Sequence, residues 1–212
     1  NTLIAGGGWV KKKGEGYYKV GQSWVQSMGY FSGGLDYSPK LNSELFTTSF
    51  YSEHGLSDRF SAELYLPIFI NHITDGTVMD GGMDIIERDN AGGIGDINLG
   101  LRGSIYSSDL INVGGTFTLG LPTGKPGLGK RENLFTGDGE FNQIIRVDAS
   151  VPFGGKKVAG YSTVYSGFNN RSNNFSDEYH YGVEVGLSAM ESRLWLIGRM
   201  NGINAIDASL ET

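Results

Sequence analysis

The chain of 212 residues has no cysteine, and it contains only five prolines and three histidines. The absence of cysteine excludes disulfide bonds and thiolate-bound metals. No stretch approaches the ~20 consecutive apolar residues that a transmembrane helix requires. The sequence therefore predicts no helical membrane span. It leaves open a transmembrane β-barrel, because the strands of a barrel alternate in polarity and have low overall hydrophobicity.

Basic character is also scarce, since the net charge is −6 and the longest basic run is Lys11-Lys12-Lys13. A chain of this charge is not expected to bind nucleic acid. The sequence contains no cofactor-binding motif, and we expect the protein to bind no cofactor. The 34 glycines and the 12% aromatic residues are instead typical of a β protein with many turns and close strand crossings.

Apolar and polar residues alternate with a period of two over about ten residues at a time. Along 111–121, for example, Ile111, Val113, Phe117 and Leu119 alternate with small and polar residues. In a soluble β-sandwich the polar face of each strand would meet water and would carry more lysine and glutamate than this chain does. The pattern favours a barrel with one face toward lipid and the other toward a lumen, although a soluble β-barrel remains an alternative. Nine strands are expected, near 16–31, 41–55, 60–71, 96–106, 111–121, 143–153, 157–170, 179–189 and 193–205.

The predicted connections alternate between short and long. Short turns are expected at 55–58, 107–109, 154–156 and 191–192, and long polar loops at 32–41, 74–92, 124–140 and 170–178. Outer-membrane barrels have short periplasmic turns and longer extracellular loops. We therefore expect an antiparallel up-and-down barrel in a bacterial outer membrane, with the N-terminus periplasmic, the long loops extracellular and the targeting segment already removed.

An odd number of strands would leave an unpaired edge in lipid, where unsatisfied backbone groups are costly. We accordingly expect residues 1–212 to form a single barrel domain that lacks its C-terminal strand or strands, or that a partner closes. The complete barrel is expected to have 12 strands, within a range of 10–14. The expected partners are outer-membrane lipid, other outer-membrane proteins and a small solute that the sequence does not identify.

Charged residues on the polar faces are the candidate functional residues. The lumen-lining candidates are Lys19, Glu63, Asp96, Arg102, Arg146, Asp148 and Glu184. Their mixed signs allow two interpretations, an internal network of ion pairs or the charged lining of a pore. The candidates for extracellular loops are Asp75, Asp80, Asp84, Glu87, Asp89, Lys125 and Lys130. The acidic run from 75 to 89 raises the question of Ca²⁺ binding, but its register is not that of a calcium-binding loop, and no metal is predicted.

Enzymatic chemistry would require a nucleophile beside a base. The three histidines, His54, His72 and His180, are the only imidazole bases, and no G-x-S-x-G motif is present. We interpret all three as polar rim or lumen residues and predict that the protein is not an enzyme. A barrel hydrolase that acts on lipids stays as the third hypothesis for its function.

Several segments resemble the outer-membrane protein family named after the meta-pathway of phenol degradation. They are GDINLGLRGSIY (95–106), GGTFTLGLPTGK (114–125), FTGDGEFN (135–142), GYSTVYSGFNNR (160–171) and DEYHYGVEVGL (177–187), with KKKGEGYYKVGQSW (11–24) and EHGLSDRFSAELYLP (53–67) at the start. The resemblance implies a channel-like barrel for passive, loop-gated passage of small solutes, hydrophobic ones included. The alternative function is that of a non-transporting subunit in a larger outer-membrane assembly.

Overall fold

A computed structural model of the chain describes residues 7–31, 37–80, 83–155, 158–173, 175–189 and 194–206. These residues form an all-β protein with ten strands and no helix. None of the described segments is therefore a helix that could cross a membrane. The strands are β1 (Gly16–Phe31), β2 (Tyr37–Gly55), β3 (Phe60–Asp80), β4 (Met83–Gly93), β5 (Ile97–Ser107), β6 (Asn112–Leu121), β7 (Asn142–Gly154), β8 (Ala159–Arg171), β9 (Asp177–Ala189) and β10 (Leu194–Ile206).

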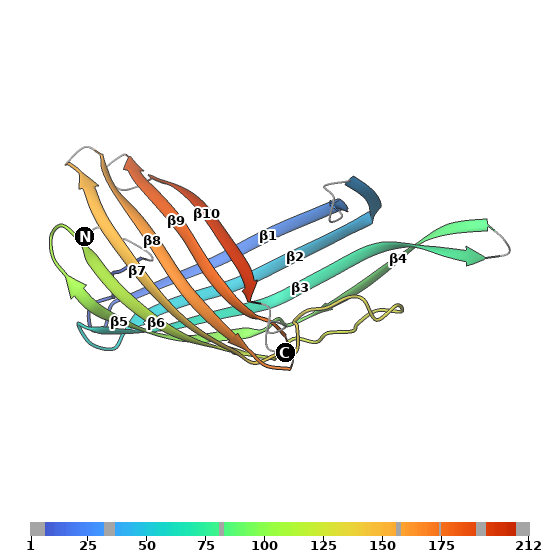
Figure 1. Cartoon of the computed structure of the whole chain (residues 1–212), viewed down its shortest axis with the longest axis horizontal. Coiled ribbons are helices and arrows are strands. Elements are labelled where there is room, and N and C mark those ends of the chain that lie inside the picture. The colour runs from blue at the N-terminus through green and yellow to red at the C-terminus, as the bar shows by residue number, and fades with distance from the viewer. Residues whose placement is uncertain are drawn as a thin grey trace.

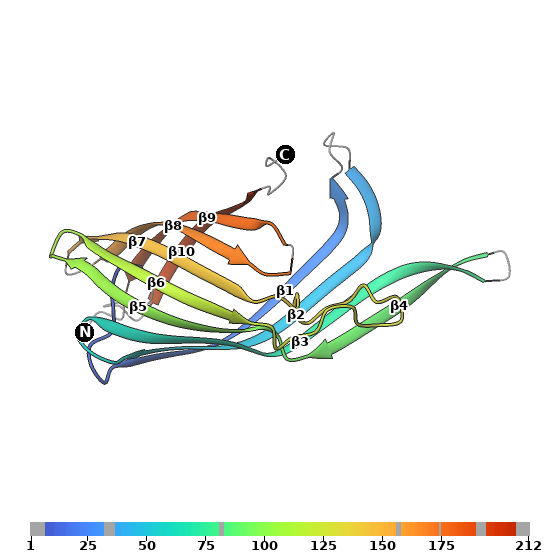
Figure 2. The same ribbon diagram turned by 60° about the horizontal axis from the view of Figure 1, so that its bottom comes forward.

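All ten strands belong to one antiparallel sheet in the order β1-β2-β3-β5-β6-β7-β8-β9-β10, and β4 pairs with the far half of β3. The sheet is strongly curled, so that β1 to β3 form one wall of a half-barrel and β8 to β10 form the other (Figures 1 and 2). Apart from β4, which pairs only with β3, the strands follow one another across the sheet in sequence order, as in an up-and-down barrel. The prediction of an antiparallel up-and-down sheet is thus confirmed.

The prediction of a long loop at 74–92 is wrong. Residues 70–80 of β3 pair in continuous register with residues 83–93 of β4, so the segment is a hairpin that projects beyond the sheet. It adds a tenth strand to the nine that the alternation predicts. Five of the residues predicted to lie in extracellular loops therefore belong to strands: Asp75 and Asp80 in β3, and Asp84, Glu87 and Asp89 in β4. The side chains of Asp80 and Asp84 lie outside the described part of the structure.

The hairpin forms because β3 changes its partner part-way along its length. Residues 60–65 pair with β5, whereas residues 70–80 pair with β4. Pro67 stands at the change of partner and has no backbone N–H to donate to a ladder. Its carbonyl accepts a hydrogen bond of 2.9 Å from the N–H of Gly95, in the short link between β4 and β5. The link between β8 and β9 is also shorter than expected, because β8 ends at Arg171 and β9 begins at Asp177.

Polar and apolar side chains are distributed in the opposite way to a soluble protein. Among the described residues, the only buried apolar side chains are Leu134 and Tyr161, whereas Glu53, Arg102 and Asp148 are among many buried polar ones. Large apolar residues are exposed instead, as shown by the exposed fractions of 65% for Ile105 and 73% for Leu196. They alternate along the strands with polar residues of the concave face, so they cover the convex face of the half-barrel.

The loop at 122–141 is ordered and packs against the projecting hairpin. Within the loop, Leu128 and Leu134 exchange two backbone hydrogen bonds, of 2.7 and 3.0 Å. The guanidinium of Arg131 donates to the carbonyls of Thr74 (3.2 Å) and Glu87 (3.3 Å), and so joins the loop to both strands of the hairpin. Lys130 forms an ion pair with Glu87, and this hydrogen bond raises the pKa of the Lys130 ammonium.

Replacing Gly76 in the hairpin is expected to release this loop. A Cβ atom at Gly76 would overlap the guanidinium of Arg131, which lies across the backbone there. Hydrogen bonds from a charged group contribute ~1.5–3 kcal/mol, so their loss predicts about tenfold faster tryptic cleavage after Lys130 and Arg131 in Gly76→Ala. Gly92→Ala in β4 is the control, because its Cβ would make only ordinary contacts. Equal cleavage rates in the two variants would contradict the docking role of Arg131.

Candidate functional site

The concave face is crossed by an N-terminal strap, defined as residues 7–13. The N–H of Gly8 donates to Ser150 Oγ on β7 at 2.8 Å, and the N–H of Lys11 donates to Ser61 Oγ on β3 at 2.8 Å. Arg102 on β5 donates to the carbonyl of Gly7. Trp9 packs edge-on against Tyr161 of β8, with 5.8 Å between the ring centroids. The strap therefore bridges strands from both walls of the half-barrel.

Glycine at position 8 is required by the close approach of the strap to β6. A Cβ atom there would clash with the carbonyl of Asn112, and the strap backbone also lies against Gly114 of the same strand. The strap backbone can lie this close to β6 because neither Gly8 nor Gly114 has a side chain. The strap is thus pressed onto the sheet.

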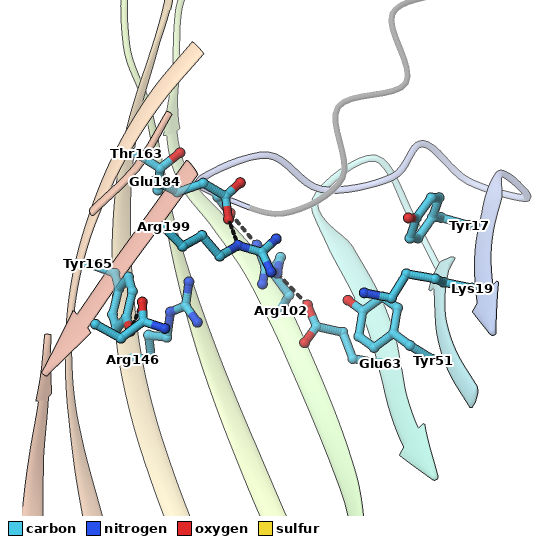
Figure 3. A pocket seen from close by; sticks show the side chains of 12 residues that line it. Tyr17, Lys19, Tyr51, Glu63, Arg102, Arg146, Thr163, Tyr165, Glu184 and Arg199 are labelled. Carbon is cyan, nitrogen blue, oxygen red and sulfur yellow. Dashed lines mark hydrogen bonds and ion pairs between the residues drawn. The ribbon is translucent and has the colours of Figure 1, made fainter. Parts of the chain in front are cut away.

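A cavity of about 310 Å³ lies beside the strap on the concave face (Figure 3). Its lining comes from β1, β2, β3, β5, β7, β8, β9 and β10, so it spans the half-barrel from wall to wall. Five of the seven predicted lumen residues meet here: Lys19, Glu63, Arg102, Arg146 and Glu184. The view also shows Tyr17, Tyr51 and Tyr165 around the same space.

Ion pairs neutralise most of the charge on this face. Arg102 Nε lies 2.5 Å from Glu63 Oε1, and Arg199 binds Glu184. The sixth predicted residue, Asp148, is fully buried in the sheet and accepts a hydrogen bond of 2.9 Å from Arg146 Nε. These contacts agree with the interpretation of the charges as an internal network.

The guanidinium of Arg146 also lies 3.9 Å from the ring centroid of Tyr165, a cation–π contact. Gly182 on β9 makes room for this tyrosine, because a Cβ atom there would come within 2.6 Å of the Tyr165 ring. Tyr165 is further held by Asn201 of β10, with 3.0 Å between the phenol oxygen and Asn201 Oδ1. Arg146 and Tyr165 thus form a fixed pair in the interior.

Three cavities follow one another along the concave face. A second cavity, of about 240 Å³, shares Glu63, Arg102, Arg146 and Tyr165 with the first. A third, of about 280 Å³, shares Asn98 and Ile144 with the second. The three form a polar track from the strap to the end of the sheet that carries loop 122–141. Asp96, the seventh predicted lumen residue, lines this third cavity and not the first.

The other predicted residues lie outside the track. Glu87 and Asp89 are used by loop 122–141, since Asp89 Oδ2 accepts the N–H of Lys130 at 2.7 Å. Lys125 and Lys130 belong to that loop, as predicted. Within the described residues, no group of three or more acidic or histidine side chains is arranged to hold a metal ion.

His72 lies beside a serine, with 3.3 Å between Ser43 Oγ and His72 Nε2. Its other ring nitrogen, Nδ1, accepts the backbone N–H of Phe135 at 3.2 Å. A neutral imidazole that accepts at Nδ1 carries its proton on Nε2. That nitrogen then donates to Ser43 and cannot remove the hydroxyl proton, so the pair has the wrong tautomer for a nucleophile and base. His180 is bound by Glu178 at 2.8 Å, and His54 is exposed.

The strap and the inward tyrosines are the functional features that the sequence did not reveal. Tyr17 and Tyr51 both line the first cavity. Gly6-Gly7-Gly8 was the available signal, because consecutive glycines indicate a close backbone approach. Comparison of the chain with protein-family models and with curated protein sequences finds no match.

Proposed function

We propose that the chain forms the wall of an outer-membrane β-barrel, with 12 strands when closed, through which small solutes pass without a cofactor. The solutes include hydrophobic ones, and the resemblance to the phenol meta-pathway family is part of the proposal. The strap narrows the passage at the end of the short turns. The long connections, the projecting hairpin and loop 122–141, lie at the extracellular end.

The polarity of the two faces supports a membrane location. Apolar side chains on the convex face, such as Leu101, Ile145 and Val147, would meet lipid, while their chain neighbours Arg102 and Arg146 face the interior. Burying apolar area in hydrocarbon is worth ~25 cal/mol per Å², and in water this face would remain exposed. Buried polar groups and exposed apolar ones are the pattern of transmembrane barrels, which is the reverse of the pattern in soluble proteins.

The observation that carries the conduit proposal is the continuous polar track. Its three cavities run along the concave face, and consecutive cavities share residues. A sealed scaffold has no need for connected space along its axis. The ion pairs inside leave little net charge at the first cavity, so this part of the track is expected to admit neutral solutes.

A second function is favoured by the strap, which occupies the concave face and is tied to Arg102, Ser150 and Ser61. In that alternative the barrel is sealed and serves as a subunit of a larger outer-membrane assembly. Single-channel recording of the protein in planar bilayers distinguishes the two functions. Stable conductance steps support the conduit. A silent bilayer, together with partner proteins that co-purify after gentle detergent extraction, supports the subunit.

Blocking the track tests the conduit more sharply. Thr118 of β6 lines the second cavity, whereas its neighbour Phe117 is exposed on the convex face. Thr118→Trp is expected to lower the single-channel conductance by about half or more, because the indole fills part of the narrow lumen. Phe117→Trp is the matched control on the same strand and should leave the conductance unchanged. The proposed route is wrong if both variants conduct like the parent protein.

A further inference from the structure

The third cavity is strongly acidic. It lies at the end of the sheet that carries loop 122–141, and four carboxylates line it: Asp96, Asp138, Glu140 and Glu178. Arg171 is the only cation among the described residues of its lining. It binds Glu140 and Glu178, and it lies 3.8 Å from Asp138. His180 outside the lining contacts Glu178, and even a protonated His180 would leave an excess of two negative charges.

Two buried acceptors in the lining of this cavity have no hydrogen-bond donor among the residues that the structure describes. Glu140 is 1% exposed, and Asn169 is 4% exposed. Glu140 Oε1 accepts from Arg171 Nε at 2.7 Å, but Oε2 of the same carboxylate has no partner. Asn169 donates from Nδ2 to Asn142, and its Oδ1 also has no partner. Leaving a buried acceptor unpaired costs ~1–3 kcal/mol, and more for a charged group.

The carboxylates of this site are poorly compensated. Burial raises the pKa of Asp96, whose oxygens accept the N–H groups of Gly124 (2.8 Å) and Asp138 (3.0 Å). Burial also raises the pKa of Glu140. Both residues lie outside the strands, in the link before β5 and in loop 122–141. A cation with N–H groups would supply both the positive charge and the hydrogen-bond donors that the described residues do not provide.

We propose that the third cavity is a binding site for small organic ammonium ions. A primary ammonium carries one positive charge and three N–H donors. In the proposed site its N–H groups donate to Glu140 Oε2 or Asn169 Oδ1, and its charge offsets the carboxylates of Asp96 and Asp138 in the same lining. Among the described residues no group of ligands is arranged for a bare metal ion, which would need oxygens that converge more closely. A cavity of about 280 Å³ has room for the carbon chain of an alkylamine.

Calorimetric titration of the full chain in detergent with butylammonium tests the proposal. Because binding is measured directly, the result does not depend on whether the barrel conducts solutes. We expect saturable binding that Glu140→Gln and Asp138→Asn each weaken about tenfold, since each removes a charge-assisted contact. Asp138 has an exposed side chain, so its variant should fold normally. Glu132→Gln, at an exposed position in the same loop, is the control and should bind like the parent.

Two further titrations decide the chemistry of the ligand. Tetramethylammonium has the same charge and no N–H donor, so it should bind at least about tenfold more weakly than butylammonium. Equal affinity for the two ions would overturn the assignment, because it would show that the site attracts any cation through its negative charge alone. Ca²⁺ is the third probe. If Ca²⁺ displaces butylammonium at equal concentration, the site is a metal site and the proposal is wrong.

Discussion

Replacing Arg102 by methionine should lower the free energy of unfolding by about 3–5 kcal/mol, the usual result of removing one member of a buried ion pair. Arg102 is 5% exposed and lies 2.5 Å from Glu63, and it also holds the strap through the carbonyl of Gly7. Methionine fills similar space but leaves Glu63, whose side chain is 14% exposed, without a counter-ion. The strap loses its contact with β5 at the same time.

Urea unfolding in lipid vesicles, followed by tryptophan fluorescence, measures this change. Arg88→Met is the control, because Arg88 is 62% exposed and lies 3.6 Å from its partner Glu44. An exposed pair of this kind contributes less than ~1 kcal/mol. A double variant, Arg102→Met with Glu63→Gln, should recover part of the loss, since it removes the uncompensated carboxylate. If Arg102→Met and Arg88→Met lose equal stability, the interior network does not stabilise the half-barrel.

Replacing Gly8 by valine should detach the strap and widen the interior. The Cβ of any residue at this position would clash with the carbonyl of Asn112, so the strap cannot stay against β6. Thr163, which is 2% exposed under the strap, should become accessible. The conductance of the proposed channel should rise in parallel, because the strap crosses the concave face.

Cysteine labelling measures the release of the strap directly. The chain contains no cysteine, so Thr163→Cys supplies a single thiol. We expect Gly8→Val to increase its rate of modification by a thiosulfonate about tenfold or more, which corresponds to weakening the strap by ~1.4 kcal/mol. Gly155→Val in the same background is the control, because no described residue lies within 4 Å of a Cβ atom at that position. An unchanged rate in Gly8→Val would show that the strap does not cover Thr163.

The clean alternation of the central strands predicted their faces correctly. Along β6 and β7, the apolar residues Phe117, Ile145 and Val147 are exposed, and the polar residues Thr116 and Asp148 are buried. The alternation predicts this because successive side chains of a strand point to opposite faces. In β10 the pattern is ambiguous, because Ile197 and Leu196 are both apolar and both exposed. Only the register with β9, which pairs Arg199 with Glu184, assigns its faces.

The projecting hairpin was missed for a local reason. The charged residues Asp75, Glu87 and Asp89 made the segment resemble a solvated loop, although Gly81-Gly82 is a typical two-residue hairpin signal. The hairpin contacts distant residues of loop 122–141, above all Arg131. Those contacts join positions that are more than 40 residues apart. A local pattern cannot reveal them.

The sequence by itself determined the all-β class and the faces of the regular strands. The alternation of apolar and polar residues is a local property of each strand, so it does not depend on which neighbour the strand pairs with. The tertiary structure alone decided that five of the seven predicted lumen residues share one cavity, that Asp96 belongs to another, and that residues 7–13 cross the concave face. These outcomes depend on how far the sheet curls and on which strands it brings opposite one another, and both depend on non-local hydrogen bonds.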